Sequence, residues 1–180
     1  MYNNDVLLIA AAGNSGTSDY TYPASYQAVI SVASIISNKE RSSFSQCNNQ
    51  VELSAPGSSI YSTVPGGGYG VKSGTSMATP YVAGVAGLLR MFFPKCANSQ
   101  ICGVMAYTAQ DLQVSGCDVE TGFGLIQADN AFKLLKSTKC GSLKGNPTGG
   151  CYKLKKKRRN KKRQSSLVQN LDKRTRGHKR

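Results

Sequence analysis

The sequence predicts an α/β fold with a mostly parallel sheet, and three observations support this prediction. Residues 6–12 form a continuous apolar run of strand length, and residues 28–36 form a second run that is rich in β-branched side chains. Residues 75–93 form a longer apolar stretch of helix length. Strands that are apolar on both faces are typical of parallel sheets covered by helices, so these three segments together favour an α/β domain.

The first apolar strand ends in a sharp turn, Gly13-Asn14-Ser15-Gly16. In open α/β sheets the binding sites lie at the carboxyl ends of the strands. Asn14 therefore has two interpretations. It is either a turn residue that tolerates a left-handed backbone, or a residue whose carboxamide points into a site.

Further along the chain, residues 60–64 and 69–72 are expected to form a β-hairpin around the glycine-rich turn at residues 65–68. The long apolar helix follows at residues 75–93. Because this helix is apolar all round, we expect it to be buried, with its glycines in close approach to the sheet. A second helix is expected over residues 98–109.

Ser76 lies in the first turn of the long apolar helix, directly after Gly74 and Thr75. Unpaired backbone N–H groups and the positive end of the helix dipole favour negative charge at this position. A serine at a helix start is most often an N-cap. The same setting suits a nucleophilic serine, because attack on a carbonyl creates an oxyanion beside it.

Two segments resemble the subtilisin-like serine proteases. The nucleophile segment of that family is closely similar to residues 74–84, which read Gly-Thr-Ser-Met-Ala-Thr-Pro-Tyr-Val-Ala-Gly. Its oxyanion-hole strand end is closely similar to residues 11–14, Ala-Ala-Gly-Asn. With further similarities at residues 54–57 and 122–126, the resemblance covers about residues 6–136.

The resemblance implies the C-terminal part of a three-layer subtilisin-like domain, and peptide hydrolysis through an acyl-enzyme on Ser76. The Asn14 amide and the Ser76 backbone N–H would bind the oxyanion, and Thr75 would support this hole with its hydroxyl. One wall of the pocket for the substrate residue before the cut would be formed by Ala11, Ala12 and Gly13. Polypeptides are the implied substrates. No cofactor is required and no metal ligand is assigned, while a structural calcium ion, present in some relatives, is left open.

The catalytic base that Ser76 needs is missing from the matching region. A serine at its free pKa is a poor nucleophile, and it needs a base that a third group orients. The single histidine is His178, whose surroundings resemble no catalytic motif. In subtilisins the chain order is aspartate, histidine, serine, so both partners are expected upstream of residue 1. We therefore expect this chain to be the C-terminal half of a catalytic domain and to be inactive alone.

The six cysteines indicate disulfides and an oxidising compartment, although buried free thiols are the alternative. Full pairing allows 15 arrangements, among which Cys96 with Cys102 is one candidate because the two bracket a short loop. No Cys-x-x-Cys is present, which argues against a zinc site. The apolar stretches are shorter than the roughly 20 residues of a membrane helix. We expect a secreted monomer without a membrane segment when the protein is full-length.

Charge is distributed unevenly along the chain. Of the net charge of +14, nearly all comes from residues 151–180, which carry fourteen Lys or Arg and a single acid, Asp172. We therefore predict a partial peptidase domain over residues 1–140, a Gly/Pro-rich linker over residues 141–151 and a disordered basic tail over residues 152–180. The tail is either a solvated segment or a binding site for nucleic acid or another polyanion.

Two alternatives to an active protease follow from these observations. One is an inactive pseudoprotease fragment that keeps the fold without its base. The other is a polyanion-binding module that acts through the basic tail. The joint presence of Asn14, Thr75 and Ser76 favours the protease, because a decayed site has no reason to keep all three. A nucleotide-binding loop at residues 122–124 is a weak hypothesis, because Gly-x-Gly alone is not specific.

Overall fold

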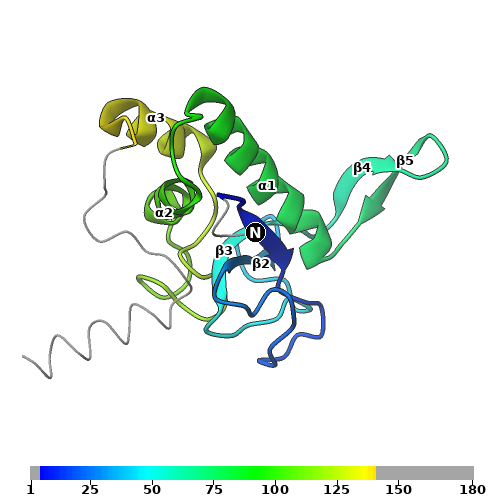
Figure 1. Ribbon diagram of the computed structural model, residues 1–180. Coiled ribbons are helices and arrows are strands. Elements are labelled where there is room, and N and C mark those ends of the chain that lie inside the picture. The colour runs from blue at the N-terminus through cyan, green and yellow to red at the C-terminus, as the bar shows by residue number, and fades with distance from the viewer. Residues whose placement is uncertain (1–4, 141–180) are drawn as a thin grey trace, which may run out of the picture.

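The computed structural model describes residues 5–140 (Figure 1). The predicted linker and basic tail, together with His178, lie outside the described residues. The helices and strands of the described part are β1 (Leu8–Ala11), β2 (Val29–Ile35), β3 (Val51–Pro56), β4 (Ile60–Val64), β5 (Gly68–Lys72), α1 (Thr75–Phe92), α2 (Asn98–Thr108) and α3 (Ala128–Thr138).

The main sheet is parallel, as predicted. β2 lies in the middle, paired with β1 on one side and with β3 on the other. Every residue of β2 is buried, because the strand has a neighbour on both sides and packed groups on both faces. β3 is a strand that the sequence analysis does not predict, since Glu52 and Ser54 interrupt its apolar pattern. Both polar residues are nevertheless buried.

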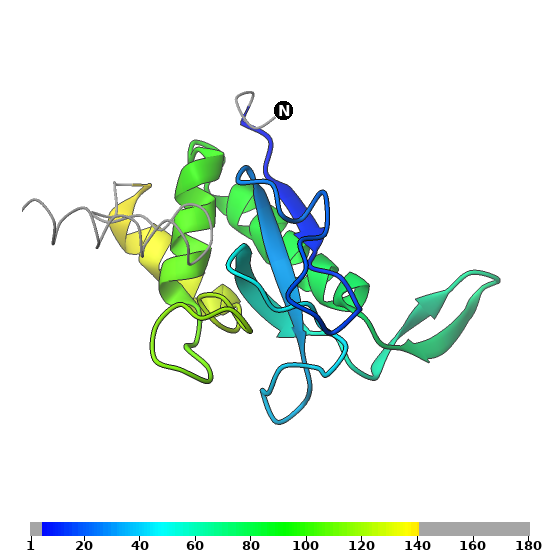
Figure 2. The ribbon, with the colours of Figure 1, turned by 90° about the horizontal axis from the view of Figure 1, so that it is seen from below.

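The core lies between the sheet and α1. Figure 2 shows α1 running behind the three strands, with α2 and α3 packed together to one side. Alternate residues of a strand face opposite sides, and Ile30 and Val32 accordingly join the cluster beneath α1, while Ala33 packs with Ala12 and Val51 in a second cluster. The α/β fold class is confirmed. Within residues 5–140, no helix has both the length and the hydropathy to cross a membrane.

The prediction that the long helix is buried all round is wrong for the described structure. α1 buries one stripe against the sheet, formed by Ala78, Val82, Ala86 and Leu89 together with Thr75. Its opposite side is exposed, including large apolar side chains: Tyr81, Leu88, Met91 and Phe92.

The glycines of α1 do not approach the sheet either. Gly84 and Gly87 lie on the exposed side, where an added Cβ would meet no atom within 4 Å. β1 is similarly only half-buried, although its sequence is apolar on both faces. The reason is common to both: within residues 5–140, β1 pairs with β2 alone, and α1 is covered by the sheet on one side.

The predicted hairpin is confirmed. β4 and β5 pair antiparallel from Ile60 opposite Lys72 to Val64 opposite Gly68, and the hairpin extends away from the main sheet (Figure 1). Tyr61 and Tyr69 stack across it with ring centroids 5.5 Å apart. The second helix is also confirmed, as α2, and α3 follows as an element that the sequence analysis does not predict.

Residues 122–124 pack against other backbone segments. Gly124 has a φ of +111°, and a Cβ there would lie 1.9 Å from the carbonyl oxygen of Gln110. Its own carbonyl accepts a hydrogen bond from the Ser54 N–H of β3. The glycine is thus explained by close approach of two chain segments, which leaves no observation in favour of a nucleotide loop.

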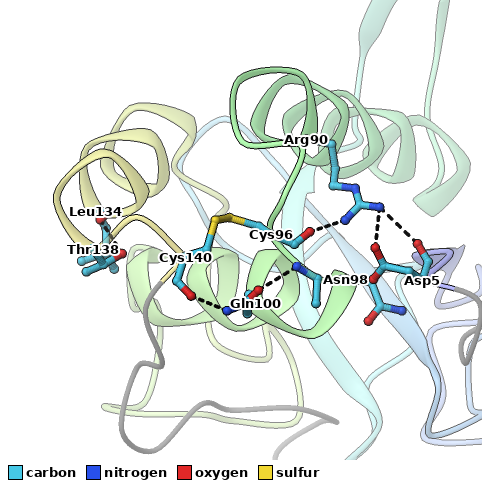
Figure 3. The surroundings of a disulfide bond; sticks show 9 residues. Asp5, Arg90, Cys96, Asn98, Gln100, Leu134, Thr138 and Cys140 are labelled. Atoms are coloured by element: carbon cyan, nitrogen blue, oxygen red, sulfur yellow. Dashed lines mark hydrogen bonds and ion pairs between the residues drawn. A yellow bond between two sulfur atoms is a disulfide. The ribbon is translucent and has the colours of Figure 1, made fainter.

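Cys96 is paired with Cys140, not with Cys102 (Figure 3). The bond connects the segment after α1 to Cys140, the second residue after the end of α3, 44 positions further along the chain. Cys102 is buried in the main core cluster, and among the described residues neither Cys102 nor Cys47 forms a disulfide. Cys117 is disulfide-bonded as well. Sequence proximity is misleading here, because the fold brings the Cα atom of Cys140 to 5.2 Å from that of Cys96.

Near this disulfide, Asp5 connects the start of the chain to two helices (Figure 3). Its carboxylate accepts hydrogen bonds from the Asn98 backbone N–H, at the start of α2, and from the Arg90 guanidinium, near the end of α1. The bond from Asn98 and the adjacent Arg90 charge lower the pKa of Asp5.

This contact predicts a pH-dependent contribution to stability. Because the pKa of Asp5 is lower in the folded chain than in the unfolded chain, its contribution is complete above the unfolded value of about 3.9 and is lost as the pH falls below it. Asp5→Asn should therefore be less stable than the wild type at pH 7, by a difference that shrinks below about pH 4. Urea unfolding midpoints at several pH values measure this. A difference that stays constant down to pH 3 would contradict it.

Candidate active site

The predicted site residues come together where the loop after β1 meets the start of α1. Asn14 follows the carboxyl end of β1, and Ser76 is the second residue of α1. They are far apart in the sequence, yet Thr75 connects them directly, because its backbone N–H and its side chain both reach Asn14. The parallel sheet allows this meeting, since α1 begins at the end of the sheet at which β1 stops.

Thr75 fixes the orientation of the Asn14 carboxamide. The Thr75 backbone N–H and hydroxyl both donate to Asn14 Oδ1, at 2.8 and 2.9 Å. The Thr75 hydroxyl also accepts a hydrogen bond from the Gly13 N–H at 3.3 Å. With Oδ1 held by two donors, the Nδ2 end of Asn14 is the end left to face the site. Thr75 is fully buried, so this arrangement is part of the packed structure.

Ser76 and the Asn14 amide border a common space. A Cβ built on Gly74 would lie 3.6 Å from Asn14 Nδ2 and 3.7 Å from the Ser76 backbone nitrogen. Asn14 Oδ1 would lie 3.8 Å from the same Cβ, so the Asn14 carboxamide and the Ser76 backbone nitrogen, from distant segments, border one small region beside the serine. Gly74 keeps that region open, and its N–H is held by the Gly57 carbonyl at 2.8 Å.

Ser76 itself is exposed in the first turn of α1, where the helix dipole is positive. Residues 5–140 contain no histidine, and across that part of the chain the Ser76 hydroxyl makes no hydrogen bond. The described residues thus hold an exposed serine next to the Asn14 carboxamide, without a histidine. They also contain no cluster of three His, Cys, Asp or Glu side chains that would suit a metal ion.

The segment before Asn14 is held in place by its backbone. The Ala12 N–H donates to the Val32 carbonyl at 3.0 Å, which extends the pairing of β1 with β2 beyond Ala11. The Ala12 side chain is buried in the core, so Ala12 could line a pocket only with its backbone, whereas Ala11 is half-buried.

A groove of about 330 Å³ lies between the β4–β5 hairpin and the first turns of α1. Met77, Pro80 and Tyr81 line it from the helix, and residues 60–64 line it from the hairpin. Met77, the residue after Ser76, therefore lines this groove.

Sequence analysis misses Gln46, which lies beneath the Asn14 loop. Its side chain is 2% exposed and forms hydrogen bonds to Ser15, Thr17 and Asp19. No local pattern marks a single glutamine in a polar loop, and its partners lie 27 to 31 positions away. The only sequence signal is the polarity of residues 42–50, which is common to most surface loops.

The fold and the site define a class: an α/β protein in which a parallel sheet brings a serine and an asparagine together at the carboxyl end of a strand. Comparison with known proteins makes this specific. The model of the Subtilase family matches residues 1–124. Subtilisin DY of Bacillus licheniformis is 42% identical over 134 residues, which cover 72% of this chain and 48% of that protein. The chain therefore belongs to the subtilase family of serine proteases.

Other relatives agree. The thermostable alkaline protease of Halalkalibacterium halodurans is 43% identical over 129 residues, covering 72% of this chain and 35% of that protein. Among solved structures, the psychrophilic subtilisin-like protease Apa1 of Pseudoalteromonas sp. AS-11 has a TM-score of 0.73 at 25% identity, covering 78% of this chain and 66% of that one. The chain spans about half the length, or less, of the curated relatives it matches.

The contacts of Thr75 predict a specific cost for removing its hydroxyl. Thr75→Val keeps the volume but leaves the Gly13 N–H without its acceptor, so the chain should lose about 1–3 kcal/mol of stability. Thr79→Val is the matched control, because the Thr79 hydroxyl bonds only the Thr75 carbonyl one turn back in the same helix. Urea unfolding measures both variants. Equal losses of unfolding free energy in the two variants would show that the Asn14–Thr75–Gly13 contacts stabilise the chain no more than the Thr79 hydrogen bond does.

Proposed function

We propose that the full-length protein is a subtilisin-like serine endopeptidase and that Ser76 is its nucleophile. The observation that supports this most directly is the common space bordered by Asn14 Nδ2 and the Ser76 N–H. Two N–H groups beside an exposed serine suit the stabilisation of a tetrahedral intermediate. Membership of the subtilase family supports the same reaction.

In this proposal Ser76 Oγ attacks the carbonyl carbon of a peptide bond, and its proton passes to a base outside residues 5–140. The new oxyanion accepts hydrogen bonds from the Ser76 N–H and from Asn14 Nδ2. When the tetrahedral intermediate collapses, the amine leaves with the proton held by the base, and an ester remains on Ser76. Water then hydrolyses that ester by the same steps, with the base accepting the proton of the water.

The residues around Ser76 and Asn14 orient these groups and shape the space around them. Thr75 gives both of its donors to Asn14 Oδ1, so its part in the oxyanion hole is to keep Nδ2 turned toward the intermediate. Residues 11–13 form one wall of the substrate pocket, to which Ala12 contributes only its backbone because its side chain is buried. The start of α1 adds its dipole to the stabilisation of negative charge.

The remaining features of the proposal concern the whole protein. Its substrates are polypeptides, its catalytic aspartate and histidine lie in sequence beyond the described residues, and it requires no cofactor. An extracellular location fits the Cys96–Cys140 disulfide, since such bonds persist in oxidising compartments. The pseudoprotease shares the same fold, and the polyanion-binding module acts through a tail outside the described residues. Neither alternative has a specific observation in its favour.

The 180-residue chain by itself should show no peptide hydrolysis above background. Its serine has no base among residues 5–140, and an unactivated serine retains only the effects of binding and of the oxyanion hole. A fluorogenic peptide mixture incubated with the purified chain tests this. Turnover that disappears in Ser76→Ala would overturn the assignment of the base to sequence outside this chain.

A chimera tests the site directly. Residues 5–140 are joined to the portion of Subtilisin DY that the match does not cover, which supplies the rest of a catalytic domain. We expect peptide hydrolysis that Ser76→Ala abolishes. Asn14→Ala should lower kcat by about 10²–10³, which is the loss that removal of the oxyanion-hole asparagine causes in a subtilisin.

The control is Asn38→Ala, which changes an exposed asparagine that bonds only the Glu40 N–H in a loop. A folded chimera without activity, or one in which Asn14→Ala behaves like this control, would contradict the proposed roles.

A further inference from the structure

We propose that Gln46 is a positioning residue, which holds the loop of residues 13–19 so that the Asn14 carboxamide keeps its orientation toward Ser76. This inference rests on the proposed function, since it concerns the same oxyanion site. Gln46 does not itself border the space beside Ser76, so its effect passes through the loop that carries Asn14.

The Gln46 side chain makes four hydrogen bonds to that loop. Its Oε1 accepts hydrogen bonds from the backbone N–H groups of Ser15 and Thr17, both at 3.1 Å. Its Nε2 donates to the Thr17 hydroxyl at 3.0 Å and to the Asp19 carbonyl at 3.2 Å. A carboxamide has two acceptor lone pairs and two N–H donors, so all four are satisfied. Because the side chain is buried, an unpaired group on either side of this contact would be costly.

The backbone of Gln46 also bonds to the start of the loop. The Gln46 backbone N–H donates to the Gly13 carbonyl at 3.0 Å. Gly13 has a φ of +115°, and a Cβ there would lie 2.6 Å from Gln46 Cγ, so the loop passes directly over this side chain. Asn14 thus stands between Gly13 and Ser15, and both are hydrogen-bonded to Gln46.

Asn14 is consequently fixed from two directions. Gln46 fixes the backbone on either side of it, and Thr75 fixes its side-chain oxygen. Residues 13–19 contain no helix or strand, and apart from the contacts between Thr17 and Asp19 their hydrogen bonds go to residues outside the loop. Without the Gln46 side chain the loop would keep its backbone bonds to Phe44 and Cys47, but the Ser15 N–H, next to Asn14, would lose its acceptor.

Hydrogen exchange in the full chain tests this, measured residue by residue by NMR. The Thr75 N–H donates to Asn14 Oδ1, so its exchange rate reports whether that side chain stays in place. In Gln46→Ala we expect the Thr75 N–H to exchange at least about tenfold faster. The Gly74 N–H, which bonds the Gly57 carbonyl, and the amides of β2 should keep their wild-type rates.

Tyr20→Phe is the matched control, because it removes another hydrogen bond between the same two loops, from the Tyr20 hydroxyl to Asn49. It should leave the Thr75 exchange rate unchanged. An unchanged Thr75 rate in Gln46→Ala, or an equal acceleration in β2, would overturn the proposal, since the latter would indicate a general role in folding.

A second variant covers the case in which Gln46→Ala does not fold. Gln46→Glu keeps an acceptor for Ser15 and Thr17 but loses both donated bonds. We expect its Thr75 N–H to exchange faster than in the wild type, and a wild-type rate would count against the proposal. The exchange rates do not depend on catalysis, so an inactive chimera would refute the proposed function without deciding the role of Gln46.

Discussion

The hydrogen bonds that Thr75 donates to Asn14 Oδ1 connect the end of β1 to the start of α1, 61 positions further along the chain. They make a site out of two segments that carry no chemistry separately. An exposed serine at a helix start is ordinary, and so is an asparagine in a turn. What distinguishes this arrangement is that one residue, Thr75, adjoins the serine and orients the asparagine.

This contact depends on the parallel sheet beneath it. Because β1, β2 and β3 run in the same direction, the loops after them gather at one edge. The loop after β2 contributes Gln46, the segment after β3 contributes Gly57, and the loop after β1 contributes Asn14. Gly57 and Asn14 each accept a hydrogen bond from the start of α1, and Gln46 accepts one from the loop that carries Asn14. The rigid strands therefore set the positions, and the loops supply the polar groups.

The exposed side of α1 and the half-buried state of β1 follow from the same geometry. Their sequences are apolar enough for full burial, whereas the described residues cover each of them on one side. An apolar surface of this kind stays in contact with water at a cost in free energy. The pattern of apolar residues is thus suited to more contacts than residues 5–140 provide, in keeping with a chain that spans at most about half of its relatives.

The sequence by itself determined the local elements and the chemical motif. Apolar runs indicated β1, β2 and α1 to within a few residues, and the Gly-Thr-Ser segment with Asn14 indicated the family, because both signals are contained in short stretches. The tertiary structure decided the rest: the partner of Cys96, the burial of polar residues in β3, the exposed side of α1 and the place of Gln46. Each of these depends on contacts between residues far apart in the sequence, and a local pattern carries no information about which distant group will face it.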